Sequence, residues 1–247
     1  MIKRYTLILI LLYCALFGNN PVLAQDKIAD SIQIHQTTAN MAALFDKAVV
    51  EQSRLYNGPA FVPYKLKSET NANFQDVTDF NIGSVNYDGI VYTNVPLIYN
   101  IDRDMLISKL YNGFSVYTLL SDMVYEFDLL NHHFVRILPD NLNKQMVAGF
   151  YDELYDGKLQ LLARRVKTVQ TATSLSGMKN VFYPKTDYFL KKGGVYYNAN
   201  SQGKILDVLK DKKKELKQYI KDNKVDFGDN PEPAMVMLVA YYDHLTK

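Results

Sequence analysis

The chain has 247 residues, with 28 lysines and arginines against 26 aspartates and glutamates, a formal net charge of +2, and a single cysteine. This near-neutral balance argues against a dedicated nucleic-acid binder, and one cysteine cannot form an intramolecular disulfide or a cysteine-only metal site. The length suits one sizeable domain or two small ones.

Residues 1–24 have the pattern of a secretory signal peptide. Lys3 and Arg4 precede an apolar run that Asn19-Asn20-Pro21 ends, and Ala24 is the expected cleavage position. The run is shorter than the ~20 apolar residues that span a bilayer. Cleavage also removes Cys14 and leaves 223 residues with no formal net charge. We therefore predict an exported protein of the periplasm or cell envelope, with no transmembrane span after cleavage.

Residues 25–55 are predicted to form an N-terminal helical segment. Apolar residues there recur at spacings of three and four, which places them on one helix face. The turn sequence Leu55-Tyr56-Asn57-Gly58-Pro59 ends the segment. The stripe consists of Met41, Leu44, Phe45, Ala48 and Val49.

Residues 56–198 are predicted to form an antiparallel β body. Turn pairs such as Asp88-Gly89 and Asn112-Gly113 recur between alternating segments rich in Tyr, Phe, Val and Ile. Successive hairpins imply a β-meander in an α+β protein, which can remain an open sheet, fold into a sandwich or close into a half-barrel. The expected strands are 84–88, 90–95, 97–101, 105–110, 114–120, 123–130, 133–138, 149–155, 158–170, 181–190 and 194–198.

Residues 199–247 are predicted to form a C-terminal αα-hairpin that packs on the sheet. Asn200 or Ser201 can cap the first helix, and Asn230-Pro231 begins the second. The first helix is rich in lysine, so one alternative function is a partner-binding adaptor that uses this helix. That alternative requires a lysine patch uninterrupted by acidic side chains, which are Asp207, Asp211 and Glu215.

The segment Leu129-Leu130-Asn131-His132-His133 contains two of the four histidines. We interpret it as a hairpin corner in which Asn131 takes a positive φ. Adjacent side chains on a strand point to opposite faces, so His132 and His133 cannot ligate one metal together, and we predict no metal site and no cofactor. The leading interpretation is a non-enzymatic exported envelope protein that acts as a binding or structural module. A hydrolase with a site around His132 and His133, completed by Asp128 or Glu126, is the alternative.

A ligand, if the protein has one, is expected on a concave, tyrosine-lined face of the sheet. Arg164 and Arg165 form a basic doublet in an otherwise apolar strand and are the candidate charged contacts. Tyr99 and Tyr125 are the candidate aromatic contacts, because tyrosine combines an apolar ring with a polar hydroxyl. No catalytic residue is assigned, and the expected partners are a small ligand or another envelope protein, with no nucleic acid.

Three stretches carry a resemblance to a known group of proteins. They are YDGIVYTNVPLIYNIDRDMLI, GFYDELYDGKLQLLARR and YYNANSQGKILDVLKDKKKELKQYIKDNK, followed by a final YYDHL. From about Leu55 to Leu245 the chain resembles a family of uncharacterised exported proteins of Gram-negative bacteria, with LYNG, a β-rich body and a lysine-rich helical tail. The resemblance implies an envelope location and this architecture, and it brings no activity and no site residues.

Overall fold

The computed structural model describes residues 54–65, 68–138, 146–174 and 177–246. The predicted signal peptide, and the predicted N-terminal helix apart from its last two residues, lie outside the described residues. The described residues all belong to one unit, Gln52–Lys247.

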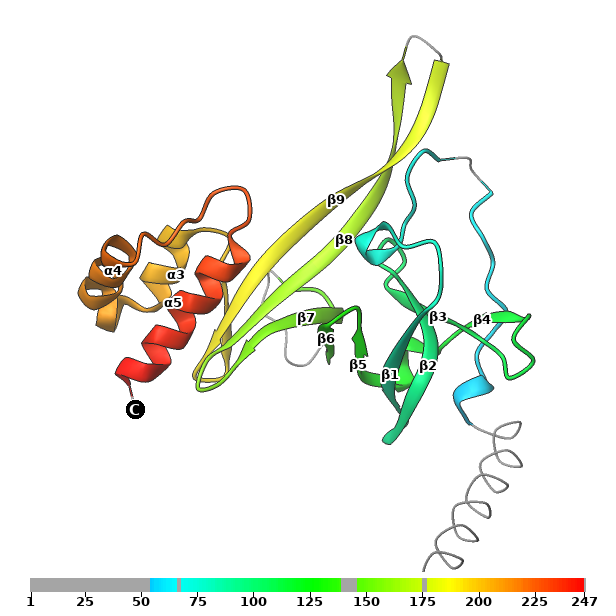
Figure 1. Ribbon diagram of the computed structural model, residues 1–247, viewed down its shortest axis with the longest axis horizontal. Coiled ribbons are helices and arrows are strands. Elements are labelled where there is room, and N and C mark those ends of the chain that lie inside the picture. Colours follow the sequence, from blue (N-terminus) through cyan, green and yellow to red (C-terminus); the bar gives the residue numbers. More distant parts are fainter. Residues whose placement is uncertain (1–53, 66–67, 139–145, 175–176, 247) are drawn as a thin grey trace, which may run out of the picture. The chain divides into compact units, whose positions relative to one another are not determined.

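Ten strands form one antiparallel sheet, and a few helices complete the fold (Figure 1). The α+β fold with a mainly antiparallel meander is therefore confirmed, and the sheet is open. The strands are β1 (Asn81–Tyr87), β2 (Ile90–Asn100), β3 (Met105–Lys109), β4 (Val116–Thr118), β5 (Val124–Leu129), β6 (His132–Ile137), β7 (Gly149–Asp156), β8 (Gln160–Ser174), β9 (Gly177–Lys192) and β10 (Val195–Asn198).

The strand order is β10-β9-β8-β7-β6-β5-β1-β2-β3-β4. Two meanders, β1–β4 and β5–β10, therefore join where β5 pairs with β1 instead of with β4. The residues 97–101, expected as a separate strand, continue the strand that begins at Ile90. Asn94 has a positive φ of 57° inside this strand, so the chain bulges before Pro96 instead of turning back.

Tight turns form where the sequence predicts them. Asp88 and Gly89 both have positive φ (53° and 79°), as a two-residue hairpin turn requires. At the β5–β6 corner Leu130 and Asn131 have φ of 54° and 63°, which confirms the predicted turn before the histidines.

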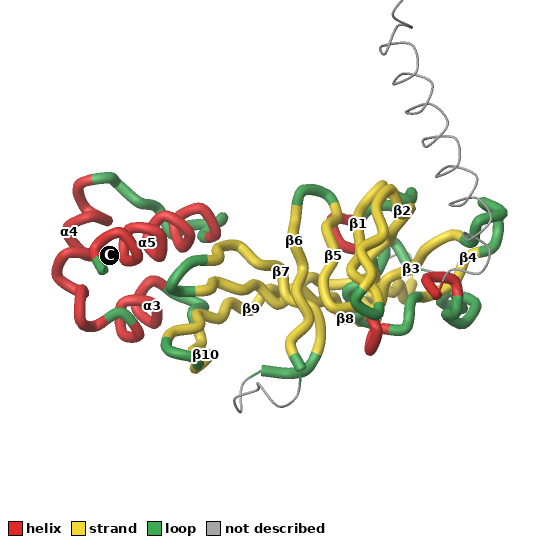
Figure 2. Tube along the Cα trace, turned by 90° about the horizontal axis from the view of Figure 1, so that it is seen from below, coloured by secondary structure: helices red, strands yellow, loops and turns green. Residues whose placement is uncertain are grey.

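The C-terminal helices are α3 (Gln202–Val208), α4 (Lys213–Asp222) and α5 (Glu232–Leu245), and they lie at one end of the sheet in Figure 2. Ser201 caps α3 by accepting from the Lys204 N–H at 3.3 Å. The first predicted helix is interrupted by a 3-10 turn at Lys210–Lys212, where Asp211 binds Lys192 and Tyr242. No helix in the described part of the chain is both long and apolar enough to cross a bilayer.

Two large apolar cores differ in chemistry. The first combines aliphatic side chains with a cluster of aromatic rings, in which Phe127 and Phe134 stack with centroids 4.6 Å apart and Tyr99 meets both edge-on. The second is mainly aliphatic and joins the helices to the sheet through Leu161 and Leu190. Burying each such side chain contributes about 1.5–3 kcal/mol, so the helices are held to the sheet mainly by this second core.

Candidate functional site

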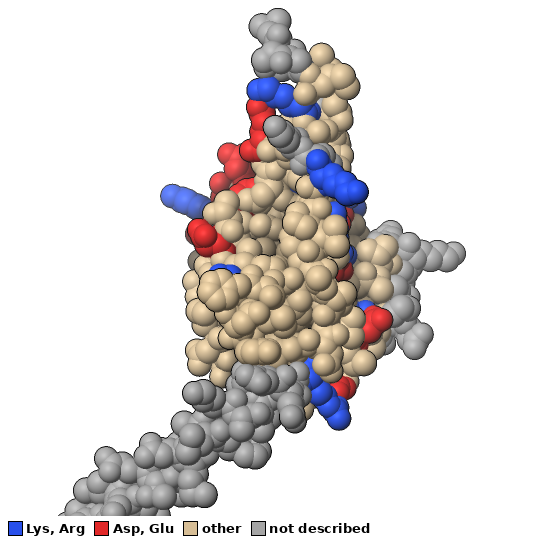
Figure 3. All heavy atoms as spheres, turned by 90° about the vertical axis from the view of Figure 1, so that its right-hand side faces the viewer, with Lys and Arg blue, Asp and Glu red and all other residues tan. Residues whose placement is uncertain are grey.

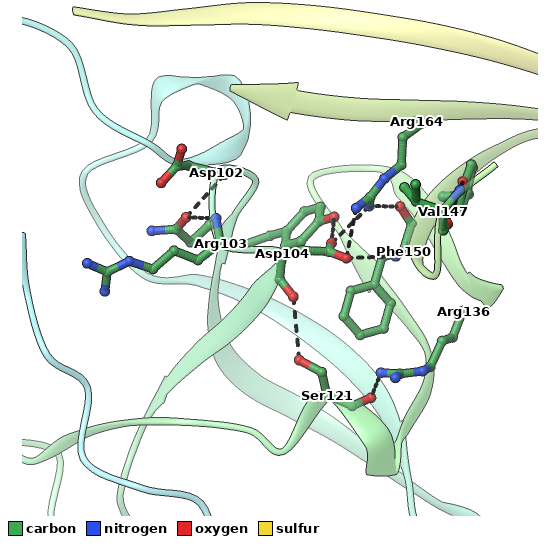
Figure 4. A network of polar contacts seen from close by, with 11 residues as sticks. Asp102, Arg103, Asp104, Ser121, Arg136, Val147, Phe150 and Arg164 are labelled. Atoms are coloured by element: carbon green, nitrogen blue, oxygen red, sulfur yellow. Dashed lines mark hydrogen bonds and ion pairs between the residues drawn. The ribbon is translucent and has the colours of Figure 1, made fainter. Parts of the chain in front are cut away.

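Arg164 and Asp104 form a two-pronged ion pair at the edge of the first core (Figure 4). The two guanidinium nitrogens lie 3.0 Å from the two carboxylate oxygens, and Arg164 also donates to the Phe150 carbonyl at 2.6 Å. The fully buried Tyr99 donates its hydroxyl proton to Asp104 at 2.6 Å. Burial and the negative charge of Asp104 raise the pKa of Tyr99 well above its ordinary value, so this hydroxyl stays protonated.

Gly149 makes this ion pair possible. A Cβ at this position would lie 2.1 Å from an Asp104 carboxylate oxygen and 2.7 Å from Arg164 Nη2, and its φ of 145° disfavours any side chain. Burial alone would lower the pKa of Arg164, but the hydrogen bonds and charge of Asp104 outweigh this effect and raise it. Arg164 is therefore a permanently charged, internally paired residue.

Arg165 points to the other face of β8 and belongs to a second network. It donates to Asp152 at 2.7 Å and to both carboxylate oxygens of Glu232, at 2.8 and 2.9 Å, at the start of α5. Tyr188 donates to the same Glu232 at 2.8 Å. His132 Nδ1 lies 2.7 Å from Asp152, so the network reaches from helix α5 to the β5–β6 corner.

The two histidines have separate carboxylate partners, as their positions on opposite faces of β6 require. His133 Nδ1 lies 2.7 Å from Asp128, while the Nε2 atom of His132 faces Gln75 at 3.0 Å. A histidine with a carboxylate on Nδ1 resembles part of a catalytic triad, which needs a nucleophile at Nε2. Among the described residues, no serine or threonine hydroxyl hydrogen-bonds to either Nε2 atom.

The residues of the alternative hydrolase do not assemble as one site. Ser84 donates its proton to Asp128 at 2.5 Å and so lies beside the carboxylate instead of beside the imidazole. Glu126 is on the His133 face, 3.9 Å from Nε2, and has no contact with His132. Within the described ranges, no three His, Cys, Asp or Glu side chains form a group that could hold a metal ion.

The lysine-rich tail is interleaved with acidic side chains. Lys213 pairs with Asp207 at 2.6 Å, and Lys192 of β9 pairs with Asp211 at 2.6 Å. Glu215 lies 3.9 Å from Lys212. The uninterrupted lysine patch that an adaptor would need is therefore divided by all three acids.

The four candidate ligand contacts lie in different surroundings. The structure brings Arg164 and Tyr99 together on Asp104, in a buried network. Arg165 lies in the second network. Tyr125 lies on the surface, with 50% of its area exposed. Both arginines already have carboxylate partners within the protein.

A pocket of about 290 Å³ lies between residues 61–64 and 68–73, the end of β2 and strand β9. Phe61, Tyr64 and Phe182 give it aromatic walls, and the Tyr64 and Phe182 rings meet edge-on at 5.2 Å. Its lining contains no charged residue in the described part of the chain. The lining residues are Phe61, Pro63, Tyr64, Ser68, Thr70, Asn71, Ala72, Asn73, Asn100 and Phe182.

Asn100 is the most informative lining residue, because it is 99% buried and only the oxygen of its side-chain amide has hydrogen-bond partners among the described residues. Its Oδ1 accepts from the N–H groups of Asp102 (3.2 Å) and Arg103 (2.9 Å) and from the Tyr64 hydroxyl (3.4 Å). Its Nδ2 donates to no acceptor among the residues that the structure describes. An amide donor without a protein acceptor can donate to a ligand or a water molecule.

Tyr64 stays neutral in this pocket. Burial and its hydrogen bond to Asp102 at 2.5 Å raise its pKa to about 12, and the Arg103 guanidinium lies 3.8 Å from its ring centroid. The pocket therefore offers aromatic surface, amides and hydroxyls, without a charge on its lining.

This pocket could not be predicted from the sequence. Its walls come from residues far apart in the chain, and segment 61–73 has no periodic pattern. The cluster Ser68-Glu69-Thr70-Asn71-Ala72-Asn73 was the available signal, because polar side chains that bind nearby backbone are typical of ordered loops.

The chain matches no family model, no curated protein and no solved structure at a significant level.

Proposed function

We propose that this protein is a non-enzymatic, exported envelope protein that acts as a binding module. The single observation that carries the proposal is the Asn100 Nδ2 donor, which has no acceptor among the described residues, in a pocket with a neutral and partly aromatic lining. The separation of His132 from His133, each with its own carboxylate, favours binding over hydrolysis.

The pocket chemistry supports a small neutral ligand that has both hydroxyl groups and an apolar face. A charged ligand would lose its hydration without gaining an ion pair on the lining. Aromatic rings can cover an apolar ligand face, while the Asn100 amide can donate to a hydroxyl oxygen. A single saccharide unit has this chemistry and fits a pocket at the small end of the usual range.

Ligand-observed NMR with N-acetylglucosamine, glucose and galactose tests the ligand class, with glucuronic acid as the anionic comparison. We expect saturation transfer to a neutral sugar and a weaker signal from glucuronic acid. Asn100→Asp keeps the oxygen that binds the backbone and removes the donor, so it should weaken binding by about tenfold, the equivalent of one hydrogen bond.

Phe182→Leu is the second variant, because it alters the aromatic wall without adding a buried charge. Tyr125→Ala is the matched control, since Tyr125 is exposed and lies outside the pocket lining. If no neutral sugar binds, or if Tyr125→Ala weakens binding as much as Asn100→Asp does, the pocket is not the site.

Export is tested separately from binding. Mass spectrometry of the protein recovered from the periplasmic fraction should give a chain that begins at Gln25. The signal pattern of residues 1–24 and the resemblance to exported proteins support this expectation. A chain that retains Met1 and remains in the cytoplasm would contradict it.

A further inference from the structure

Strands β8 and β9 form a long hairpin that extends beyond its neighbours (Figure 1). β8 pairs with β9 from Gln160 to Ser174, whereas its pairing with β7 ends at Ala163. Beyond that point, the edge of β8 that faces away from β9 makes one backbone hydrogen bond within the described ranges, from Lys167 N–H to the Ile101 carbonyl at 3.3 Å.

That hydrogen bond identifies which backbone groups are free. In an antiparallel strand the N–H and C=O of one residue point to the same side, and the side alternates along the chain. The backbone N–H of Lys167 points away from β9. The backbone groups of Val169, Thr171 and Thr173 therefore point away from β9 as well. Their three N–H groups and three carbonyls are available for another strand.

The other edge of the hairpin already pairs with another segment of the chain near Asn180. Asn180 of β9 is bridged in parallel by Ser68, and its carbonyl accepts from the Glu69 N–H at 3.1 Å. The hairpin therefore already accepts an added chain segment on one side and leaves the β8 side open.

The open edge lacks the usual protection against pairing. Exposed edge strands normally carry lysine, proline or a bulge, and the sequence has no charged residue and no proline from Thr168 to Met178. Figure 3 shows uncharged side chains at the described end of the hairpin, with charged side chains beginning just below it. Thr168, Val169, Gln170, Thr171 and Thr173 are exposed.

We propose that this edge pairs antiparallel with the same edge of a second copy of the chain. A two-fold axis brings identical residues close together, so an edge with a charge near the axis would repel itself. The neutral stretch centred near Thr171 meets this condition, and threonine and valine favour strands. Pairing along this short edge buries less surface than the ~1,200 Å² typical of a stable interface. The dimer is therefore weak and concentration-dependent.

Sedimentation velocity of the purified protein from about 10 µM to about 1 mM tests this inference, a range in which weak dimers form reversibly. We expect the average sedimentation coefficient to rise with concentration. Thr171→Pro removes an outward N–H without removing a hydrogen bond to β9, and should keep the protein monomeric throughout.

Thr171→Val is the matched control, because it keeps the N–H and the strand preference, and it should associate like the original chain. Near-UV circular dichroism verifies that both variants are folded. The inference is overturned if the original chain stays monomeric at the highest concentration, if Thr171→Pro associates equally, or if Thr171→Val loses association as fully as the proline variant does. Sugar binding is independent of these outcomes, because Thr171 is outside the pocket lining.

Discussion

Arg164 and Arg165 are neighbours in β8, yet they stabilise different parts of the molecule. Arg164 binds Asp104 in the β2–β3 turn and so links β8 to the first meander. Arg165 binds Glu232 and so links the sheet to helix α5. One strand thus uses its two faces to hold two different regions of the molecule.

The larger effect is expected on the Arg164 side. Arg164→Met leaves the partly buried Asp104 carboxylate without its cation and should reduce the free energy of unfolding by about 3 kcal/mol, the lower end of the range for buried pairs. Urea denaturation measures the loss. Replacing both partners, with Arg164→Met and Asp104→Leu together, should restore part of it, and a double variant less stable than the single one would contradict the ion-pair explanation.

Gly149→Ala tests the same network sterically. The new Cβ would overlap the Asp104 carboxylate, so we expect a loss of about 2–3 kcal/mol in thermal or urea unfolding. Gly89→Ala is the matched control, because Gly89 also has a positive φ but has open space around it. It should cost about 1 kcal/mol, and equal losses would show that backbone conformation alone accounts for the effect.

Glu232→Gln tests the Arg165 side. The amide keeps the shape but loses the charge of the two-pronged contact, so we expect a loss of about 1–2 kcal/mol by urea denaturation. Tyr188→Phe, which removes one hydrogen bond to the same carboxylate, should cost less. A loss as large as that of Arg164→Met would mean that the two arginines are equally important to the fold.

The smallest effect is expected at the exposed Asp128–His133 pair. Partial burial alone would raise the pKa of Asp128, but hydrogen bonds from Ser84 and His133 outweigh it and hold the pKa below its ordinary value of 3.8. A lowered pKa contributes stability above pH 3.8, and this contribution is lost as the pH falls through the folded-state value. Asp128→Asn should therefore cost below about 0.5 kcal/mol at neutral pH.

The pH profile of that variant provides the check. The difference in urea midpoint between the original chain and Asp128→Asn should be present at about pH 6 and should shrink as the pH falls below 3.8 through the folded-state value. A difference that persists unchanged at low pH would mean that the charge of Asp128 is not its cause.

Local features of the fold could be predicted from the sequence because their causes are local. Asn131 predicts its corner because asparagine tolerates positive φ, and Asp88-Gly89 predicts a hairpin for the same reason. The alternation of apolar residues also predicts that His132 and His133 point apart. Each of these inferences needs only residues that are adjacent or a few positions apart in the chain.

Long-range features could not be predicted in this way. The pairing of β5 with β1 depends on which strand edge is free after β2, β3 and β4 have formed, and no local pattern records this. Arg164 and Arg165 stood out as a basic doublet, but their partners lie 60 and 67 residues away. The donor of Asn100 is informative only because distant residues surround it and leave it unpaired.

The joining of the two meanders has a consequence for how the chain folds. Hairpins such as β8–β9 can form from neighbouring residues, whereas β1 and β5 must meet across about 40 residues, with Ser84 opposite Asp128. Long-range pairing of this kind slows folding, because chain entropy is lost before the contacts form. We expect the docking of β5 against β1 to limit the rate, with the Arg164–Asp104 contact forming after the barrier.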